Sequence, residues 1–363
     1  MVEWKKLGDS CKMVTPPKKL GKELYGVNGD FPIIDQGQKD IIGYTDDESS
    51  LVPNDEYVLF GDHTRYVKFF KGRFAQGADG LKILKADADV LPRYFFYAFS
   101  NTEVPSRGYS RHWSIAKELL IPIPSLDEQN RIVGILDTFT ASIDNLKEQI
   151  AQRRKQYEYY RDHLLDLEGK EGVEMKTLGE IGEFIRGNGI QKNDFVEEGY
   201  GCIHYGQIHA RYGFSAEETI SKIEESLYKK CKKAQKGDVV LATTSEDAEG
   251  VAKPFVWLGD EKVAVSGDAF IYHHNQNGKF MGYQFLTHKF MQFKVKNATG
   301  AKVVRISGDN MAKYVVALPF IEKQNEIVDI LDKFEASIQN LEAQLSQREK
   351  QYEYYRNKLL TFE

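Results

Sequence analysis

Apolar residues in two long segments of this 363-residue chain recur with the spacing of a coiled coil. From Leu136 to Leu164 they step by three and four residues alternately, and the same register returns from Leu331 to Leu359. This spacing is that of heptad positions a and d, which form the contact stripe of paired helices. The stripes consist of Leu136, Phe139, Ile143, Leu146, Ile150, Tyr157 and Leu164, and of Leu331, Phe334, Ile338, Leu341, Leu345, Tyr352 and Leu359.

The two segments are copies of one sequence. Residues 124–165 and 319–360 are related by a constant offset of 195, and about 26 of the 42 aligned positions are identical. Weaker matches precede each copy in the same order, for example 4–8 with 175–179. The chain is therefore a tandem duplication, and its unit is a variable domain followed by a long helix.

Each helix has a single apolar stripe, so each is the natural partner of the other. An antiparallel pairing places Leu136 opposite Leu359 and gives the pair a pseudo-two-fold axis. Arg153 and Arg348 interrupt the stripes. They either extend from the seam toward solvent, or set the register and bind carboxylates of a partner.

The helix ends carry local signals. Ser125 and Glu128 predict a capping box at the start of the first helix, and Gly169 is placed to end it, which gives a helix of about 43 residues. The predicted organisation is a domain at 1–124, a helix at 125–168, a linker at 169–172, a second domain at 173–319 and a second helix at 320–363.

The two domains have a mixed pattern that predicts an α+β fold. Short β-rich runs are separated by Gly, Asn and Asp turns, and each domain closes with an amphipathic helix and an apolar run. The predicted strands are Tyr57–Phe60, Tyr66–Phe70, Val239–Ala242, Val263–Val265 and Phe270–His273, the helices Pro92–Ser100 and Gly282–Lys294, and the closing runs Leu119–Pro124 and Tyr314–Pro319.

Charge and cysteine content exclude several classes of protein. With 49 Lys and Arg against 54 Asp and Glu, the chain has no global positive charge with which to hold nucleic acid, so any such binding must be local. The three cysteines are far apart and form no C-x-x-C pair, so neither a disulfide framework nor a zinc site is indicated. No run of 18 apolar residues occurs, and we expect a protein of the reducing cytoplasm.

The motifs of common enzymes are missing from the sequence. We find no G-x-x-x-x-G-K-[ST] phosphate loop, no Asn-Pro-Pro-Tyr or Gly-rich cofactor loop after a strand, and no H-E-x-x-H metal motif. We therefore expect no catalysis, no metal and no cofactor on this chain.

Residue types that read bases cluster instead on predicted loops. Arg, Asn and Gln can form bidentate contacts with base edges, whereas Lys, Ser and Thr suit phosphates. Each cluster by itself could be an ordinary solvated loop, but the clusters recur in both domains on loops that differ in sequence. The candidates are Gln36, Gln38, Lys39, His63, Thr64, Arg65, Arg107 and Arg111 in the first domain, and Arg186, Asn188, Gln207, His209, Arg211, Thr243, Thr244, Lys302 and Arg305 in the second.

This pattern resembles the specificity subunit of type I restriction-modification systems. The resemblance covers the whole chain and includes a proline-anchored helix entry followed by Gln129 in the first copy and Gln324 in the second. The second copy has Lys323 where the family commonly has Glu. The resemblance implies two target-recognition domains separated by long antiparallel helices, and a subunit that reads a bipartite DNA target with an unread gap but performs no chemistry.

The resemblance also implies partners: double-stranded DNA, two modification (methyltransferase) subunits and restriction subunits, with no membrane. Acidic residues on the outer faces of the helices, such as Asp137, Asp144 and Glu148, are candidate docking positions, or simply a solvated face. A different class of function stays open, a coiled-coil scaffold whose two β-rich domains bind proteins. A single-chain endonuclease or methylase is disfavoured by the missing motifs.

Overall fold

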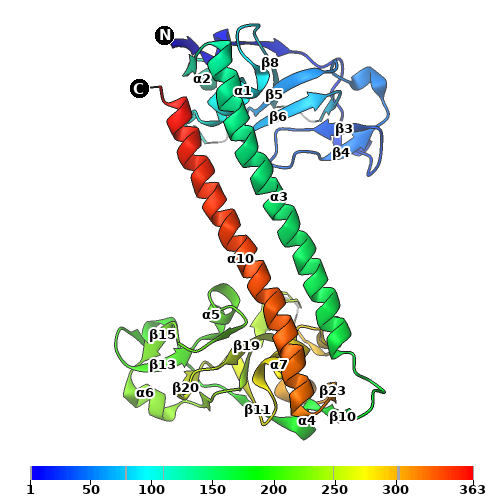
Figure 1. Ribbon diagram of the computed structural model, residues 1–363, viewed down its shortest axis with the longest axis vertical. Coiled ribbons are helices and arrows are strands. Elements are labelled where there is room, and N and C mark those ends of the chain that lie inside the picture. Colours follow the sequence, from blue (N-terminus) through cyan, green and yellow to red (C-terminus); the bar gives the residue numbers. More distant parts are fainter. Residues whose placement is uncertain (1, 78–79, 109, 248, 301–302, 363) are drawn as a thin grey trace. The chain divides into compact units, whose positions relative to one another are not determined.

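The computed structural model describes residues 2–362 except 78–79, 109, 248 and 301–302. Two units are distinguished, Met1–Glu148 with Glu342–Glu363, and Gln149–Leu341. Each contains a globular domain and half of each long helix, α3 (Leu126–Leu165) and α10 (Ile321–Leu360) (Figure 1).

The first unit is built on an antiparallel sheet of order β2-β8-β5-β6, against which helix α1 packs. A smaller sheet has the order β4-β3-β7, and β1 pairs with β9. The elements are β1 (Glu3–Lys6), β2 (Cys11–Val14), β3 (Phe31–Ile34), β4 (Gly43–Thr45), β5 (Asp55–Gly61), β6 (Val67–Gly72), β7 (Ala75–Gln76), β8 (Leu81–Ala86), β9 (Leu120–Ile123), α1 (Pro92–Ser100) and α2 (Trp113–Ala116).

The second unit contains two larger sheets, of order β11-β21-β17-β19-β14 and β12-β15-β13-β20-β16, and the pairs β10-β23 and β18-β22. Its strands are β10 (Glu174–Thr177), β11 (Gly182–Arg186), β12 (Phe195–Val196), β13 (Tyr200–Ile203), β14 (Ser215–Ala216), β15 (Ser221–Ile223), β16 (Lys233–Ala234), β17 (Val239–Ala242), β18 (Thr244–Ser245), β19 (Lys253–Trp257), β20 (Val263–Val265), β21 (Ala269–His274), β22 (Val304–Arg305) and β23 (Val315–Leu318). Its short helices are α4 (Leu178–Ile181), α5 (Tyr205–Ala210), α6 (Glu225–Lys230), α7 (Gly278–Gln284), α8 (His288–Asn297) and α9 (Gly308–Met311).

The duplication is visible in how each domain closes. Its first and last strands pair antiparallel, with Glu3 opposite Ile123 in one domain and Glu174 opposite Leu318 in the other. Each last strand then leads directly into a long helix, α3 or α10. The tandem α+β architecture predicted from the repeat is confirmed.

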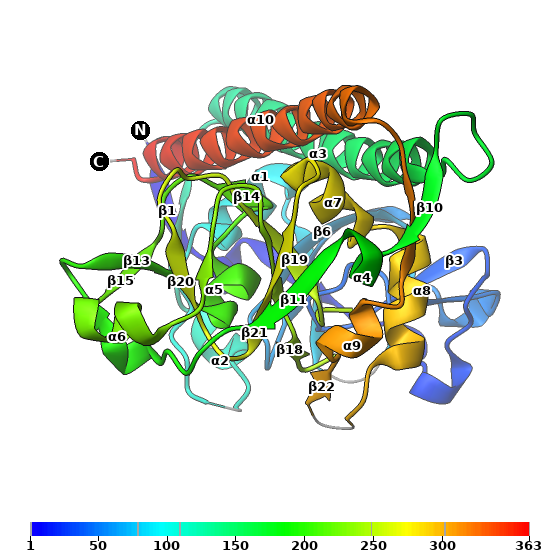
Figure 2. The same ribbon diagram turned by 90° about the horizontal axis from the view of Figure 1, so that it is seen from below.

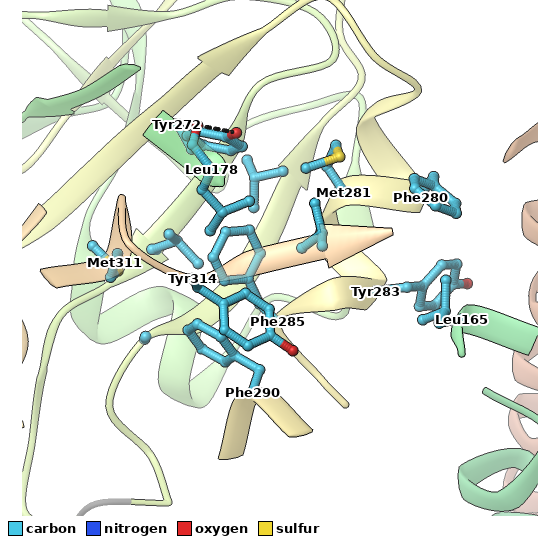
Figure 3. Packing of buried hydrophobic residues seen from close by; sticks show 14 of the residues in the cluster. Leu165, Leu178, Tyr272, Phe280, Met281, Tyr283, Phe285, Phe290, Met311 and Tyr314 are labelled. Carbon is cyan, nitrogen blue, oxygen red and sulfur yellow. Dashed lines mark hydrogen bonds between the residues drawn. The ribbon is translucent and has the colours of Figure 1, made fainter. Parts of the chain in front are cut away.

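Each helix contributes to the core of the domain that precedes it. In the first unit, Ile132 and Leu136 of α3 pack in one cluster with Phe60 and Tyr94. In the second, Ile327 and Leu331 of α10 join a cluster that Figure 3 shows in part, where Tyr272 donates a 2.8 Å hydrogen bond to the carbonyl of Leu178. Helix and domain therefore form one hydrophobic core in each unit.

The apolar stripes meet antiparallel within each unit. In the first, Leu136 shares a cluster with Leu359, and the ring of Phe139 stacks on Tyr355 with centroids 5.3 Å apart. In the second, Leu331 shares a cluster with Leu164. Ring stacking is repeated there, between Phe334 and Tyr160 at 5.4 Å.

The two seam arginines have a role that neither sequence-based alternative included. The guanidinium of Arg348 lies 5.7 Å from the ring centroid of Phe139, and that of Arg153 lies 5.9 Å from Phe334. These are cation–π contacts, each worth about 0.5–1 kcal/mol in a partly exposed setting. Both arginines therefore pack against an aromatic ring of the opposite helix.

One buried glutamine opens each long helix and ties it to its domain. Gln129 accepts a hydrogen bond from the backbone N–H of Leu91, the N-cap of α1, at 2.8 Å, and donates to the carbonyls of Asp89 and Pro124. Gln324 likewise accepts from the N–H of the α7 N-cap, Asn277, at 3.1 Å. The glutamine shared with the family thus ties each long helix to its domain.

A second repeated contact fixes the next helical turns. Asp137 of α3 accepts from Arg93 at 2.7 Å and from the Tyr97 hydroxyl at 2.5 Å. In the second unit, Asp332 of α10 accepts from Lys279 and from the hydroxyl of Tyr283, both at 2.7 Å. Asp137 is therefore bonded to its own domain while its side chain stays 42% exposed, and its role in docking a partner remains a prediction.

Three local predictions differ from the structure. The segment Gly282–Lys294 is not one helix, because Thr287 has an extended backbone and caps α8 by accepting from the Phe290 N–H. Helix α3 ends at Leu165, and Gly169 lies in the following turn with φ +76°. At the start of α3, Glu128 does not form the predicted capping box with Ser125, because both of its carboxylate oxygens accept from Arg131.

Among the described helices, none combines the length and the apolar character that crossing a bilayer requires.

Candidate nucleic-acid interface

In the first domain, hydrogen bonds connect candidate residues that are far apart in sequence. The side-chain oxygen of Gln36 accepts from the backbone N–H of His63 at 3.1 Å, and its carbonyl accepts from the hydroxyl of Thr64. The loop after β3 therefore packs against the turn that joins β5 to β6. Gln38, Lys39 and Arg65 are exposed on these loops.

Asp62 belongs to the turn that the sequence indicated but was not itself a candidate contact residue; it anchors a third loop. Its side chain is buried; it accepts from the Trp113 N–H at 2.7 Å and lies 3.4 Å from the Lys82 ammonium. Its carbonyl lies 3.0 Å from Nδ1 of His112, whose Nε2 accepts from the Arg107 N–H. The two ring nitrogens of His112 therefore connect the 62–65 turn to the loop that contains Arg107. The sequence signal for this role was the position of Asp62 at a turn directly after a strand, where Asp side chains commonly bond to nearby backbone N–H groups.

Arg65 bridges two of these loops. It adopts φ +64°, a conformation that is unusual for a residue with a side chain, and its Nη1 donates to the carbonyl of Val104 at 3.0 Å. Arg107 and Arg111 lie exposed on the same 101–112 segment. The structure thus gathers the first-domain candidates on three adjoining loops with several exposed cations.

In the second domain, one group of candidates surrounds the turn between β20 and β21. Nε of Arg186 donates to the carbonyl of Gly267 at 3.0 Å, while its side chain remains exposed. The N–H of Asn188 donates to the carbonyl of Val265, and its side chain accepts from the N–H of Lys232. Asn188 therefore connects its loop to the segments of Val265 and Lys232, through its backbone N–H and its side-chain oxygen respectively.

A second group lies where β18 pairs with β22, which Figure 2 shows side by side. Thr244 is opposite Arg305 in this pairing, and its carbonyl lies 3.1 Å from Nε2 of His209. Lys253 donates to the carbonyl of His209 at 3.1 Å. Arg305 and Arg211 are exposed beside this contact.

Two candidates are not placed for a direct base contact, because their side chains lie inside the domain. Gln207 is 7% exposed and donates to the hydroxyl of Ser221 at 2.7 Å. Thr243 is 6% exposed and donates to the carbonyl of Asp268. For these two, the structure corrects the sequence-based assignment to a supporting role. Lys302 lies outside the described residues.

Comparisons with known proteins identify the family of the chain. The family model described as "Type I restriction modification DNA specificity domain" matches residues 1–153 and again residues 170–349. The chain is 30% identical to the specificity subunit of an Escherichia coli type I restriction enzyme, over 99% of this chain and 94% of that one. It is 27% identical to a putative specificity subunit of Haemophilus influenzae, over 99% and 96%.

Solved structures share the fold. The S subunit of a type I restriction-modification system from M. genitalium superposes with a TM-score of 0.64 at 17% identity, covering 100% of this chain and 97% of that one. A chain from a structure on complex assembly of the type I system gives a TM-score of 0.57 at 15% identity, covering 99% and 97%. On the evidence of the duplicated fold and of both matched halves, this chain belongs to the family of type I restriction-modification DNA specificity subunits.

Proposed function

We propose that this specificity subunit reads a bipartite DNA target, each domain contacting one half-site through its exposed loop cations and amides. The repetition of domain, closing strand pair and helix carries this proposal. Two similar modules with different loops suit two different short sequences separated by an unread gap. Chemistry then belongs to other chains, two modification subunits and the restriction subunits.

The proposed DNA contacts are the exposed members of the loop clusters. In the first domain these are Gln38, Lys39, Arg65, Arg107 and Arg111, and in the second Arg186, Arg211 and Arg305. Their guanidinium and amide groups can pair with guanine and adenine edges or with phosphates. Gln36, His63, Asn188, His209 and Thr244 support the loops through the hydrogen bonds described above.

Exchange of one domain tests the proposal. Replacing residues 1–124 by the matching domain of a relative should change one half of the methylated sequence and leave the other half unchanged. Methylation mapping in cells that express the complete system measures this. A change in both halves, or in neither, would contradict independent reading.

A point variant tests one proposed base contact within the first domain. Arg111→Ala should reduce discrimination at the first half-site by about 1–3 kcal/mol if its base contact is bidentate, with the second half-site unaffected. Arg73→Ala is the control, because this exposed arginine pairs with Glu48 at 3.2 Å outside the loop clusters. Equal effects of the two variants would argue against Arg111 as a base contact.

The charge balance implies that partners are needed for tight binding. A chain with net charge −5 has no net positive charge for phosphate neutralisation beyond the local loop cations, so we expect weak DNA binding by the isolated subunit and tight binding with the methyltransferase. A gel shift at physiological salt, with and without that partner, measures the difference. Nanomolar specific binding by the isolated chain would overturn the expectation.

A further inference from the structure

Two lysines lie inside the domains as buried residues. Lys68, on β6, is 8% exposed, and Lys294, on α8, is 3% exposed. Within the described part of the chain, neither ammonium has a carboxylate at ion-pair distance, and both donate to backbone carbonyls instead. Lysine is almost never fully buried without a charged partner, so these two positions require an explanation.

The carbonyls that Lys68 binds belong to one candidate DNA-reading loop. Its Nζ donates to the carbonyl of Asp35 at 3.2 Å and to that of Lys39. These two residues bracket Gln36 and Gln38, so the ammonium draws both ends of the loop together. The carboxylates of Asp35 and Asp40 attract the ammonium from nearby, while burial lowers its pKa.

Lys294 makes the same kind of contact in the second domain. Its Nζ donates to the carbonyls of Glu249 at 2.6 Å and Val251 at 2.9 Å. Both carbonyls lie in the loop that joins β18, the strand of Thr244, to β19. Burial lowers the pKa of Lys294 to about 8, and the charges of Asp247 and Glu249 oppose this shift.

An apolar side chain would fill both positions at lower cost. Removing an ammonium from water is expensive, and carbonyl dipoles compensate for it only in part. The charge instead restricts the conformation of a loop. The ammonium forms a charge-assisted hydrogen bond to each of two backbone carbonyls, and these bonds hold the loop between or beside them in place. The two lysines come from different elements, a strand and a helix, yet each restrains a loop of its own domain.

We propose that Lys68 and Lys294 are positioning residues that restrain the 35–39 and 249–251 loops and thereby set the sequence preference of their own half-site without touching DNA. This inference rests on the proposed function, since it takes these loops as part of the DNA-reading surface. It predicts that loss of either ammonium affects one half-site only.

The test uses Lys68→Met and Lys294→Met in the full-length subunit. Methionine keeps the length and apolar character of the stem and removes the charge and the donors. The controls are Lys71→Met on the same strand and Lys289→Met on the same helix, because these exposed lysines pair with Glu56 and Glu168 at the surface. Each pair of variants differs in burial, not in element or residue type.

Two measurements are made on each variant. Amide hydrogen exchange should accelerate at least about tenfold in the restrained loop alone, because local opening no longer breaks two charge-assisted bonds. Methylation mapping with the methyltransferase partner should show a relaxed first half-site for Lys68→Met and a relaxed second half-site for Lys294→Met. Lys68→Arg and Lys294→Arg, which retain charge and donors, should recover most of the preference.

Each contrary result has a distinct meaning. Unchanged loop exchange in both Met variants overturns the restraint itself, whatever the loops bind. Faster exchange with an unchanged methylated sequence overturns the role in specificity, and the proposed function still stands if domain exchange alters one half-site. Where a Met variant does not fold, Lys→Gln at the same position keeps a neutral donor and should give the same half-site pattern in weaker form.

Discussion

At the scale of single residues, the two copies differ most informatively at one pair of equivalent positions on the long helices. Thr140 in the first copy corresponds to Glu335 in the second, at the repeat offset of 195. Thr140 lies 3.4 Å from the hydroxyl of Tyr97, whereas Glu335 accepts from the hydroxyl of Tyr157 at 3.4 Å. Burial raises the pKa of Glu335 to about 7, and the charge of Asp332 adds to the effect.

This raised pKa predicts a pH-dependent stability penalty. Between the unfolded value near 4.3 and about 7, the folded state holds a proton that the unfolded chain has released, so stability falls as pH rises through this window. Glu335→Gln removes the penalty. We expect it to increase the free energy of unfolding by about 1–3 kcal/mol at pH 8 and to change it little at pH 4.

Urea unfolding of the parent protein and the variant at both pH values measures the difference. Glu326→Gln on the same helix is the control, because this exposed carboxylate pairs with Lys323 at the surface and should show no comparable pH dependence. A Glu335→Gln effect of the same size at pH 4 and pH 8 would mean that packing, not ionisation, causes it.

At the scale of elements, the joint between domain and helix depends on one amide in each half. Gln129 satisfies the N–H of Leu91 and the carbonyls of Asp89 and Pro124 at once. Gln324 serves α7 in the same way. Because an amide side chain both donates and accepts, this position couples the entry of a long helix to the start of a short one.

Gln129→Ala should therefore destabilise the first unit. It leaves one donor and two acceptors without their partner, which we expect to lower the free energy of unfolding by about 2–4 kcal/mol. Asn130→Ala is the matched control, since the neighbouring exposed amide bonds only the Leu126 carbonyl of its own helix and should change stability by less than about 0.5 kcal/mol. Chemical unfolding followed by fluorescence compares the two, and equal effects would contradict an anchoring role.

At the scale of the whole molecule, two uninterrupted helices of 40 residues follow the two domains. Under the proposed function, the heptad pattern repeated in both helices predicts that helix length sets the distance between the two half-sites. The unread gap of the proposed target should then depend on the number of heptads. This dependence can be tested without knowing the sequence that the subunit reads.

Inserting seven residues near the centre of both helices keeps the a and d register and adds about 10 Å of helix. We expect unchanged half-sites with a gap longer by about 3 base pairs, at 3.4 Å per base pair, as read by methylation mapping. The same insertion in one helix alone shifts half of the seam and should destabilise the protein. Full activity with an unchanged gap would show that the helices do not set the spacing.

The sequence by itself determined the duplicated architecture and the pairing of two long helices, whereas the contacts within each unit decided that the helices run antiparallel. Heptad spacing and repeat identity are periodic properties, so they are visible without knowing which distant residues meet. Strands such as Val239–Ala242 were found from local composition, since a short run of apolar residues between turns suits a buried strand. The break at Thr287 was missed because an apolar pattern on both sides continued through it.

Only the tertiary structure decided which candidate residues face solvent and what supports them. Arg111 and Gln207 are both suited to base recognition by residue type, yet one is exposed and the other is 7% exposed and bonded to Ser221. The pairing of Gln36 with His63 and the burial of Lys68 and Lys294 depend on chain segments distant in sequence. Burial and hydrogen-bond partners follow from packing between segments, and local residue pattern does not contain that information.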